Sequence, residues 1–337
     1  ITLGAGYGSV QGFFFTTQVS EINMLGRGQT VSLSAQLAKD SRSRSFNFGF
    51  TDPYAFDTKW SLGFDLFFVN NFIPDKYETR KLGFDVRLGY LLAEYTSVFV
   101  TYKNEGLKIL NASVLNDPLD VEADSGVLSS VVFSIVRDKR NNRFETSGGH
   151  YASASLETAG IGGDKRFVKW VLNGRYYQRL IGDLVFRSNF EYGQISQLGG
   201  DLIPPSEKFF LGGPNNLRGY RLFSIGPSRL RPASTDPADA NRLVSEPRGG
   251  TAELLGMLEL EYPLIREAGL KFVTFYDVGN AFNGFPDLDR FTLRTDAGLG
   301  IRWFSPIGPL RFEWGFPFRV KPGEDTSQFV FFIGPPF

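Results

Sequence analysis

The stretch LGFDVRLGYLL, residues 82–92, alternates apolar and polar side chains, and this alternation decides the fold. Successive side chains of an extended strand point to opposite faces, so a period of two indicates a strand with one apolar and one polar face. The apolar positions are Leu82, Phe84, Val86, Leu88, Tyr90 and Leu92, and the opposite face carries Gly83, Asp85, Arg87 and Gly89. The same period recurs along nearly the whole chain, as in residues 169–180, 183–193 and 294–304. The sequence therefore predicts an all-β protein.

The length of these alternating segments separates a membrane barrel from a soluble sandwich, which is the alternative reading of the pattern. Strands of soluble proteins are about 5 to 6 residues long. These segments run roughly 9 to 11 residues, the length that a tilted strand needs to cross a bilayer. The tryptophans also fall on the apolar faces, where rings at strand ends form the aromatic girdle of a membrane barrel; they are Trp60, Trp170, Trp303 and Trp314. We therefore expect a transmembrane antiparallel β-barrel.

The connections between the segments alternate in length. Short links near residues 25–28, 91–95, 181–182 and 263–269 are separated by longer ones, the longest near residues 196–249. Short turns on one side and long loops on the other are typical of bacterial outer-membrane barrels, as is an even number of strands. We count about sixteen strands and see no internal repeat or linker, so residues 1–337 are expected to form one domain. The sequence contains no run of 18 or more apolar residues, so no transmembrane helix is predicted.

Composition argues against several classes of function. Lysine plus arginine equal aspartate plus glutamate at 36 each, so no basic excess is available to bind nucleic acid. Cysteine is absent and His150 is the only histidine, which argues against thiol chemistry, a zinc site and a catalytic triad. Acidic side chains on the polar faces fit the lining of a wet lumen. We expect no catalytic residue, no metal and no cofactor, and hence no enzyme.

Several segments carry a family resemblance. NNLRGYRLFSIGP (215–227) resembles the V/L-R-G-F/Y motif in the sixth external loop of BamA-type outer-membrane assembly factors, which belong to the bacterial surface antigen superfamily. NMLGRG (23–28), FTDPYAFDTKWSLGFDLFF (50–68), TFYDVGNAF (274–282) and IRWFSPIGPLRFEWGFP (301–317) are similar to other parts of that barrel, in the same order. The family carries periplasmic POTRA domains before the barrel. The resemblance therefore implies that this chain is the C-terminal barrel domain, with no POTRA domain in it.

The motif in the long loop provides the first candidate site, which comprises Leu217, Arg218, Gly219 and Tyr220. A barrel of this size encloses a wide polar lumen into which such a loop can fold. A guanidinium shielded there from bulk water needs carboxylates to offset its desolvation. Alternation on the strands after the loop points Glu253, Glu259, Glu261 and Asp277 inward. The resemblance implies that Arg218 pairs with Glu259 and Asp277 and pins the loop inside the barrel; the alternative is a solvated loop arginine.

The chain ends provide the second candidate site, because the first and last strands must meet to close a barrel. ITLGAGYGSV (1–10) places Gly4, Gly6 and Gly8 on one face, and glycine weakens a strand. SQFVFFIGPPF (327–337) alternates Phe329, Phe331 and Ile333 and then continues with Gly334, two prolines and Phe337. Proline cannot donate to a ladder. We expect a short, easily opened seam; the alternative is that the glycines make room for a loop and the prolines end the strand.

The resemblance implies an insertase of the outer membrane of a Gram-negative-type bacterium. An incoming barrel precursor would pair at the seam, assemble there and bud off, without a nucleotide. The implied partners are unfolded outer-membrane β-barrel clients, outer-membrane lipid, accessory lipoproteins and periplasmic chaperones. Phe337 resembles the C-terminal signal of outer-membrane barrels, so the protein would itself be a client of such machinery. Two alternatives stay open: a polypeptide translocation or secretion transporter of the same superfamily (TamA-like or two-partner type), and a passive porin.

Overall fold

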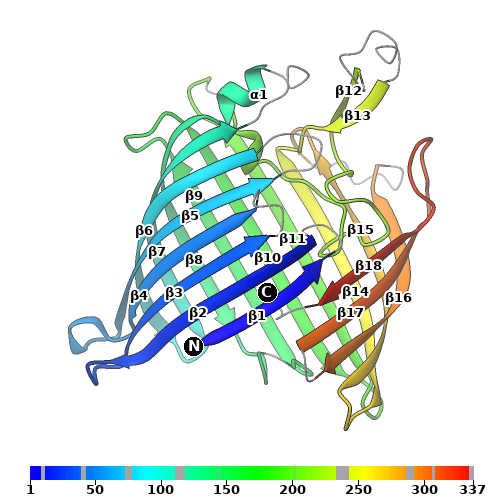
Figure 1. Cartoon of the computed structure of the whole chain (residues 1–337), viewed down its shortest axis with the longest axis horizontal. Coiled ribbons are helices and arrows are strands. Elements are labelled where there is room, and N and C mark those ends of the chain that lie inside the picture. The colour runs from blue at the N-terminus through cyan, green and yellow to red at the C-terminus, as the bar shows by residue number, and fades with distance from the viewer. Residues whose placement is uncertain are drawn as a thin grey trace.

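Antiparallel strands form a closed barrel in the computed structural model, which describes residues 1–8, 12–38, 43–72, 78–110, 118–143, 145–200, 202–232, 243–285, 292–305 and 308–333. Within these ranges the barrel has sixteen strands (Figure 1). Each strand pairs with its neighbours in sequence, except that β11 pairs with β14 and β18 closes onto β1. The sequence-based prediction of an all-β barrel with about sixteen strands is confirmed.

The barrel strands are mostly longer than the sequence pattern indicates. Their bounds are β1 Thr2–Gly8, β2 Gly12–Met24, β3 Gln29–Ala38, β4 Arg44–Asp52, β5 Trp60–Phe72, β6 Glu78–Ala93, β7 Thr96–Leu110, β8 Gly126–Asp138, β9 Gly149–Ala159, β10 Phe167–Arg179, β11 Val185–Gln197, β14 Ala252–Ile265, β15 Leu270–Phe282, β16 Arg294–Ser305, β17 Gly308–Pro317 and β18 Gln328–Ile333. Fourteen of them have 9 to 16 residues. Only β1, with 7 residues, and β18, with 6, are shorter.

The two faces of the barrel follow the alternation in the sequence. On β6 the apolar positions face outward, with Leu82 64% exposed, and on β5 Asp65 is buried on the lumen side. Trp60, Trp303 and Trp314 are exposed on the outer face. None of the helices in the described ranges is long and apolar enough to span a bilayer.

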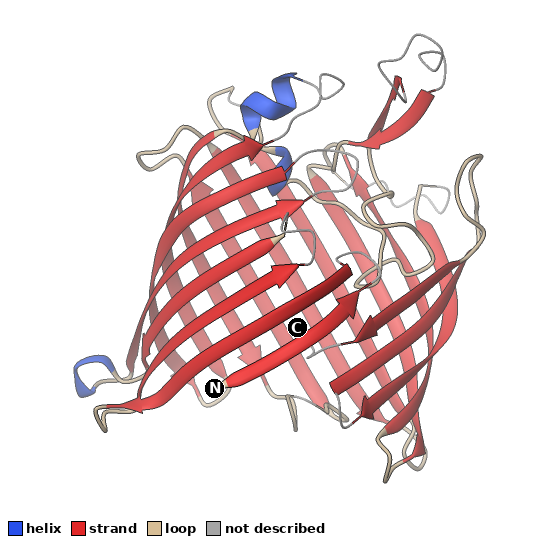
Figure 2. Cartoon of the chain, in the orientation of Figure 1, coloured by secondary structure: helices blue, strands red, loops and turns tan. Residues whose placement is uncertain are grey.

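The two rims of the barrel differ (Figures 1 and 2). One rim carries short turns, and the other carries the long connections, including a short helix, α1 (Pro118–Ala123), between β7 and β8. The longest connection, between β11 and β14, contains a two-stranded sheet of β12 (Ser228–Pro232) and β13 (Leu243–Pro247), which projects from the rim. Neither α1 nor this sheet was predicted from the sequence.

The connection between β11 and β14, residues 198–251, also supplies an apolar core inside the barrel. We call this segment the lumen loop. Four of its side chains pack together against β14; the cluster comprises Leu211, Leu217, Tyr220, Ile225 and Leu255. Earlier in the loop, Phe209 joins a second cluster formed with side chains of β7 to β11 and with Ala281 on β15. Apolar burial therefore holds the loop at two places.

The seam between β1 and β18 is short in the described residues. Its register contains two partner pairs, Tyr7 with Ile333 and Gly8 with Phe332. Every other neighbouring pair of barrel strands has at least six in the described ranges. Gly4 and Gly6 lie on β1 and pair with β2. The predicted seam residues Gly334 and Phe337 lie outside the described residues.

Candidate functional site

A tight turn at the start of the motif sets the direction of Arg218. Gly212 adopts a φ of +100°, which favours glycine, and its backbone N–H donates to Asn216 Oδ1 at 2.8 Å. The backbone N–H of Leu217 donates to the same oxygen at 2.7 Å. The Asn216 side chain therefore closes the turn, and the next side chains point toward the wall formed by β14 to β17.

Arg218 and Asp277 form a bidentate ion pair in the lumen. Arg218 Nε donates to Asp277 Oδ2 at 2.8 Å, and Nη2 donates to Oδ1 at 2.7 Å. The backbone N–H of Arg218 adds a third bond to Oδ2 at 3.3 Å. Both residues are 0% exposed. The parallel bonds match the planar fork of a guanidinium to a carboxylate, which a lysine cannot reproduce.

Two further carboxylates and an aromatic ring complete the surroundings of Arg218. Its Nη1 contacts Glu259 on β14 and lies 3.5 Å from Glu313 Oε2 on β17. The guanidinium carbon lies 3.6 Å from the centre of the Phe275 ring on β15. Burial alone would lower the pKa of Arg218, but its bonds to Asp277 and the charge of Glu259 raise that pKa above its usual value. Arg218 is therefore held as a cation by three different strands.

Two more arginines balance the charge of this cluster. Arg302 on β16 donates to Glu259 at 2.8 and 3.1 Å and to Glu313 at 2.7 and 3.0 Å. Arg311 on β17 donates to Glu313 at 2.5 Å. Three guanidiniums thus face three carboxylates, and Arg302 also lies 3.5 Å from Glu261 Oε2 on β14. We call this group the arginine cluster; it comprises Arg218, Arg302, Arg311, Glu259, Asp277 and Glu313.

The two residues after Arg218 fit tightly against β16 and β17. A Cβ on Gly219 would lie 2.6 Å from Asp296 Cβ, so only glycine allows this approach. The Tyr220 hydroxyl donates to the backbone oxygen of Thr295 at 3.0 Å, and its ring lies 4.9 Å from the Arg294 guanidinium carbon. Burial raises the pKa of Tyr220 above its usual value. The whole motif is therefore docked, not the arginine alone.

A second ionic contact holds the lumen loop to the opposite wall. Glu207, in the short 3-10 turn Pro205–Glu207, lies 3.3 Å from Lys81 Nζ on β6 and 3.2 Å from Lys169 Nζ on β10. Lys169 also donates to the Glu207 backbone oxygen at 2.9 Å. Burial would raise the pKa of Glu207, but Lys169, Lys81 and Lys103 outweigh it and lower that pKa to about 2. We call Glu207 with these lysines the lysine anchor.

The structure brings together the loop residues and the lumen partners that the sequence singled out. Leu217, Arg218, Gly219 and Tyr220 lie in one turn, and Arg218 reaches both Glu259 and Asp277. Sequence reasoning missed Glu313, Phe275 and Arg302, although alternation on β15 to β17 places all three on the lumen side. It also missed the lysine anchor, for which the only signal was the pair of inward lysines on β6 and β10.

At the other candidate site, the seam, the outward and inward faces are each bridged by rings. The ring centres of Tyr7 on β1 and Phe331 on β18 are 5.9 Å apart on the outer face, and on the lumen face Phe14 of β2 reaches past β1 to within 6.0 Å of Phe332. Phe329 is exposed on the outer face of β18. The seam therefore has few ladder bonds but some aromatic contact.

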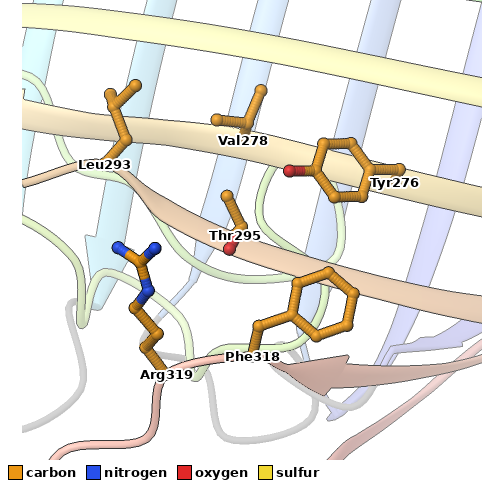
Figure 3. A pocket seen from close by; sticks show the side chains of 6 residues that line it. All are labelled: Tyr276, Val278, Leu293, Thr295, Phe318 and Arg319. Atoms are coloured by element: carbon orange, nitrogen blue, oxygen red, sulfur yellow. The ribbon is translucent and has the colours of Figure 1, made fainter. Parts of the chain in front are cut away.

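Other potential ligand sites in the described residues are sparse. No group of three or more histidine, cysteine, aspartate or glutamate side chains there is arranged to hold a metal ion. A cavity of about 360 Å³ lies beside β15 and the start of β16, and Figure 3 shows the side chains that line it. It is lined by Tyr276, Val278, Leu293, Thr295, Phe318 and Arg319. None of these belongs to the arginine cluster or the lysine anchor.

Comparisons with known proteins agree with this geometry. The family model of the Omp85 superfamily domain matches residues 23–337. The outer membrane protein assembly factor BamA of Nitratidesulfovibrio vulgaris is 27% identical over 98% of the chain, and that of Neorickettsia risticii is 28% identical over 100%. The chain spans 41% and 45% of the lengths of these relatives.

One solved structure has a closely similar barrel. BamA from Haemophilus ducreyi lacking POTRA domains 1–3 superposes with a TM-score of 0.85 at 23% identity, over 98% of this chain and 69% of that one. At this identity, the likeness shows the fold alone.

Proposed function

The chain belongs to the Omp85 superfamily, and from that premise we propose that it assists the folding and membrane insertion of outer-membrane β-barrel proteins. It is an integral protein of the outer membrane of a Gram-negative-type bacterium. The relatives named as outer membrane protein assembly factors match almost all of its length, which supports this activity. The partners would be unfolded barrel clients, with accessory lipoproteins and periplasmic chaperones delivering them.

The observation that carries the proposal is the short register between β1 and β18, with its two partner pairs. Two pairs of an antiparallel ladder supply about two backbone hydrogen bonds, each worth roughly 1 kcal/mol net. The two ring contacts add about 0.5–1.5 kcal/mol each. The described part of the seam would therefore be held by roughly 3–5 kcal/mol, less than a junction with six or more partner pairs.

The lipid around the seam favours exchange of partners over simple opening. An unpaired backbone group in hydrocarbon costs several kcal/mol, because no water is present to bind it. A client strand that pairs with the edge of β1 or β18 replaces each bond that the seam loses. The edge therefore acts as a template, and folding of the client supplies the free energy without catalytic chemistry.

The arginine cluster would keep one side of this template in place. Arg218 contacts carboxylates on β14, β15 and β17, and β17 is the strand that pairs with β18. The docked loop therefore links β14, β15 and β17, which form the part of the barrel wall next to β18. Its role is conformational: it positions the template edge and does not touch a reacting group.

A disulfide across the seam tests the proposal, because the chain contains no cysteine. Gly8→Cys with Phe332→Cys places one cysteine on each strand of a register pair. The control, Ala154→Cys with Leu172→Cys, cross-links β9 to β10 far from the seam. The otherwise intact protein is reconstituted in liposomes, and folding of an unfolded barrel client is followed by heat-modifiable gel mobility.

We expect the oxidised seam variant to fold the client no faster than empty liposomes, and reductant to restore the rate. The oxidised control should keep the full rate. Full activity of the locked seam variant would contradict the proposal.

Polypeptide translocation through the lumen is the second candidate function. The observation in its favour is that side-chain contacts hold the lumen loop in the barrel. The loop can therefore leave the lumen without loss of the hydrogen bonds between barrel strands. Translocation does not require the seam to open. Cargo transport that continues with the seam locked would favour this role, and loss of client folding in the same variant would favour the insertase.

A further inference from the structure

Three polar side chains form a row on the lipid-facing side of the barrel. Arg44 on β4 pairs in register with Asn70 on β5, and Asn70 pairs with Arg80 on β6. Neighbouring strands lie about 4.8 Å apart, so the three positions are adjacent on one face. Phe68 lies two residues from Asn70 on the same face, and both guanidinium carbons lie over its ring, at 5.7 and 5.8 Å.

This row contains polar atoms that have no partner. Asn70 is 3% exposed, and its Oδ1 makes no hydrogen bond; the Nε atoms of Arg44 and Arg80 are likewise buried and unpartnered in the described part of the chain. Buried polar atoms are almost always hydrogen-bonded, and an exception indicates a missing partner. The other atoms on barrel strands that lack a hydrogen bond in the described residues belong to lumen-facing side chains, such as Asn47 and Asp296.

The position of the row indicates which partner is missing. β4 begins at Arg44, β5 ends at Phe72 and β6 begins at Glu78, all at the rim that carries the long loops (Figure 1). In outer-membrane barrels the rim with the long loops faces the outside of the cell, so the row lies at the level of the headgroups of the outer leaflet. Toward the bilayer centre, the same face carries exposed Phe46 and Leu82.

We propose that Arg44, Asn70 and Arg80 bind a phosphate-bearing lipid headgroup of the outer leaflet, with its acyl chains lying along the apolar strip around Phe68. Guanidiniums match phosphate oxygens with planar, charge-assisted bonds. Asn70 supplies an N–H donor between them and an acceptor for a headgroup hydroxyl.

Other charged groups near the row are compatible with an anionic ligand. Lys108 on β7 is the register partner of Arg80 and is exposed, so it extends the basic row. Glu78 lies two residues before Arg80, on the same face of β6, and no ion pair joins the two side chains in the described residues. The guanidiniums are therefore not neutralised by this carboxylate and remain available to a phosphate.

The first test measures binding of lipid A, which carries two phosphates, to the detergent-solubilised protein by native mass spectrometry. Arg44→Gln with Arg80→Gln should weaken binding about thirtyfold, because each basic residue at a charged lipid surface contributes about 1 kcal/mol. Arg27→Gln with Lys59→Gln is the matched control: it removes two charges from exposed turns at the opposite rim and should change binding less than threefold. Equal binding losses in the two variants would overturn the proposal.

A second variant keeps the test decisive where the glutamine pair fails to fold. Asn70→Asp is nearly isosteric, and its carboxylate would pair with both arginines in place of the lipid. We expect it to fold, as judged by heat-modifiable mobility, and to lose lipid A binding. Wild-type binding by this variant would show that these residues do not bind the lipid, and complete displacement of lipid A by millimolar inorganic phosphate would show that they bind free phosphate without preference for a lipid headgroup; either result would overturn the proposal.

Discussion

Replacing Arg218 with alanine should loosen the lumen loop without unfolding the barrel. All hydrogen bonds to the Asp277 carboxylate in the described residues come from Arg218, two of them from the guanidinium. Glu259 and Glu313 keep bonds to Arg302 after the change. The cost of Arg218→Ala therefore falls on one carboxylate that is fully buried and loses its cation.

The size of the effect follows from this orphaned charge. Removing one partner of a buried ion pair costs about 3–5 kcal/mol. The apolar side chains Leu211, Leu217 and Ile225 remain buried, and each contributes roughly 1.5–3 kcal/mol. The loop should therefore stay mostly docked, but its free energy of local opening should fall by about 3–5 kcal/mol.

Amide hydrogen exchange measures this opening directly. The N–H of Ile225 donates to the backbone oxygen of Leu211 inside the docked loop at 2.9 Å. Because each 1.4 kcal/mol is a factor of ten, Arg218→Ala should speed its exchange roughly a hundredfold to a few thousandfold. Amides in the barrel strands should keep their exchange rates.

A matched control is available three residues away. Arg221 pairs with Asp325 on the surface and is 65% exposed, and exposed pairs contribute about 0–1 kcal/mol. Arg221→Ala should therefore change the exchange rate of Ile225 less than fivefold. Removing the orphaned carboxylate in Arg218→Ala/Asp277→Ala should recover at least tenfold. Equal rates for the two single arginine variants, or no recovery in the double variant, would refute the reasoning.

Three further outcomes are expected of the same loop. Because the pKa of Glu207 is lowered from 4.5 to about 2, the stabilisation from its contacts with the lysines should be complete above pH 4.5 and be lost as pH falls toward 2. Amide hydrogen exchange in the lumen loop, corrected for intrinsic rates, should accelerate over this pH range, and Glu207→Gln should abolish the pH dependence. Gly219→Ala would place a Cβ 2.6 Å from Asp296 Cβ and should undock the motif, raising protease sensitivity, whereas Gly174→Ala, with open space around it, should not. Phe275→Leu removes the ring beneath the guanidinium, a contact worth about 0.5–2 kcal/mol, and should speed loop exchange no more than about thirtyfold; a larger effect would mean that the ring mainly supports the barrel wall.

The barrel could be predicted from the sequence because its physical constraint is local. Every spanning strand has lipid on one side and a wet lumen on the other, so residues 82–92 and their counterparts all carry the same period of two. Alternation also assigns Glu259 and Asp277 to the lumen face. The six residues of α1 make less than two turns, too few to show a helical period, so this helix was missed.

The partners of each buried charge could not be derived in the same way. Arg218 contacts Glu313 across 95 positions, and Lys81 contacts Glu207 across 126. Many inward acids and bases satisfy the alternation, and the path of the loop through the closed barrel decides which of them meet. The family motif identified Glu259 and Asp277, but the sequence offered no comparable signal for Glu207.

The two anchors have opposite signs, and this fixes the path of the lumen loop. Glu207 meets lysines on β6 and β10, whereas Arg218, eleven residues later, meets carboxylates on β14, β15 and β17. A reversed path would bring like charges together on both walls, at a cost of several kcal/mol. Neither anchor involves β1. A movement of β1 away from β18 therefore leaves both anchors intact, so the strand edge can be exposed while the loop and the template wall stay in place.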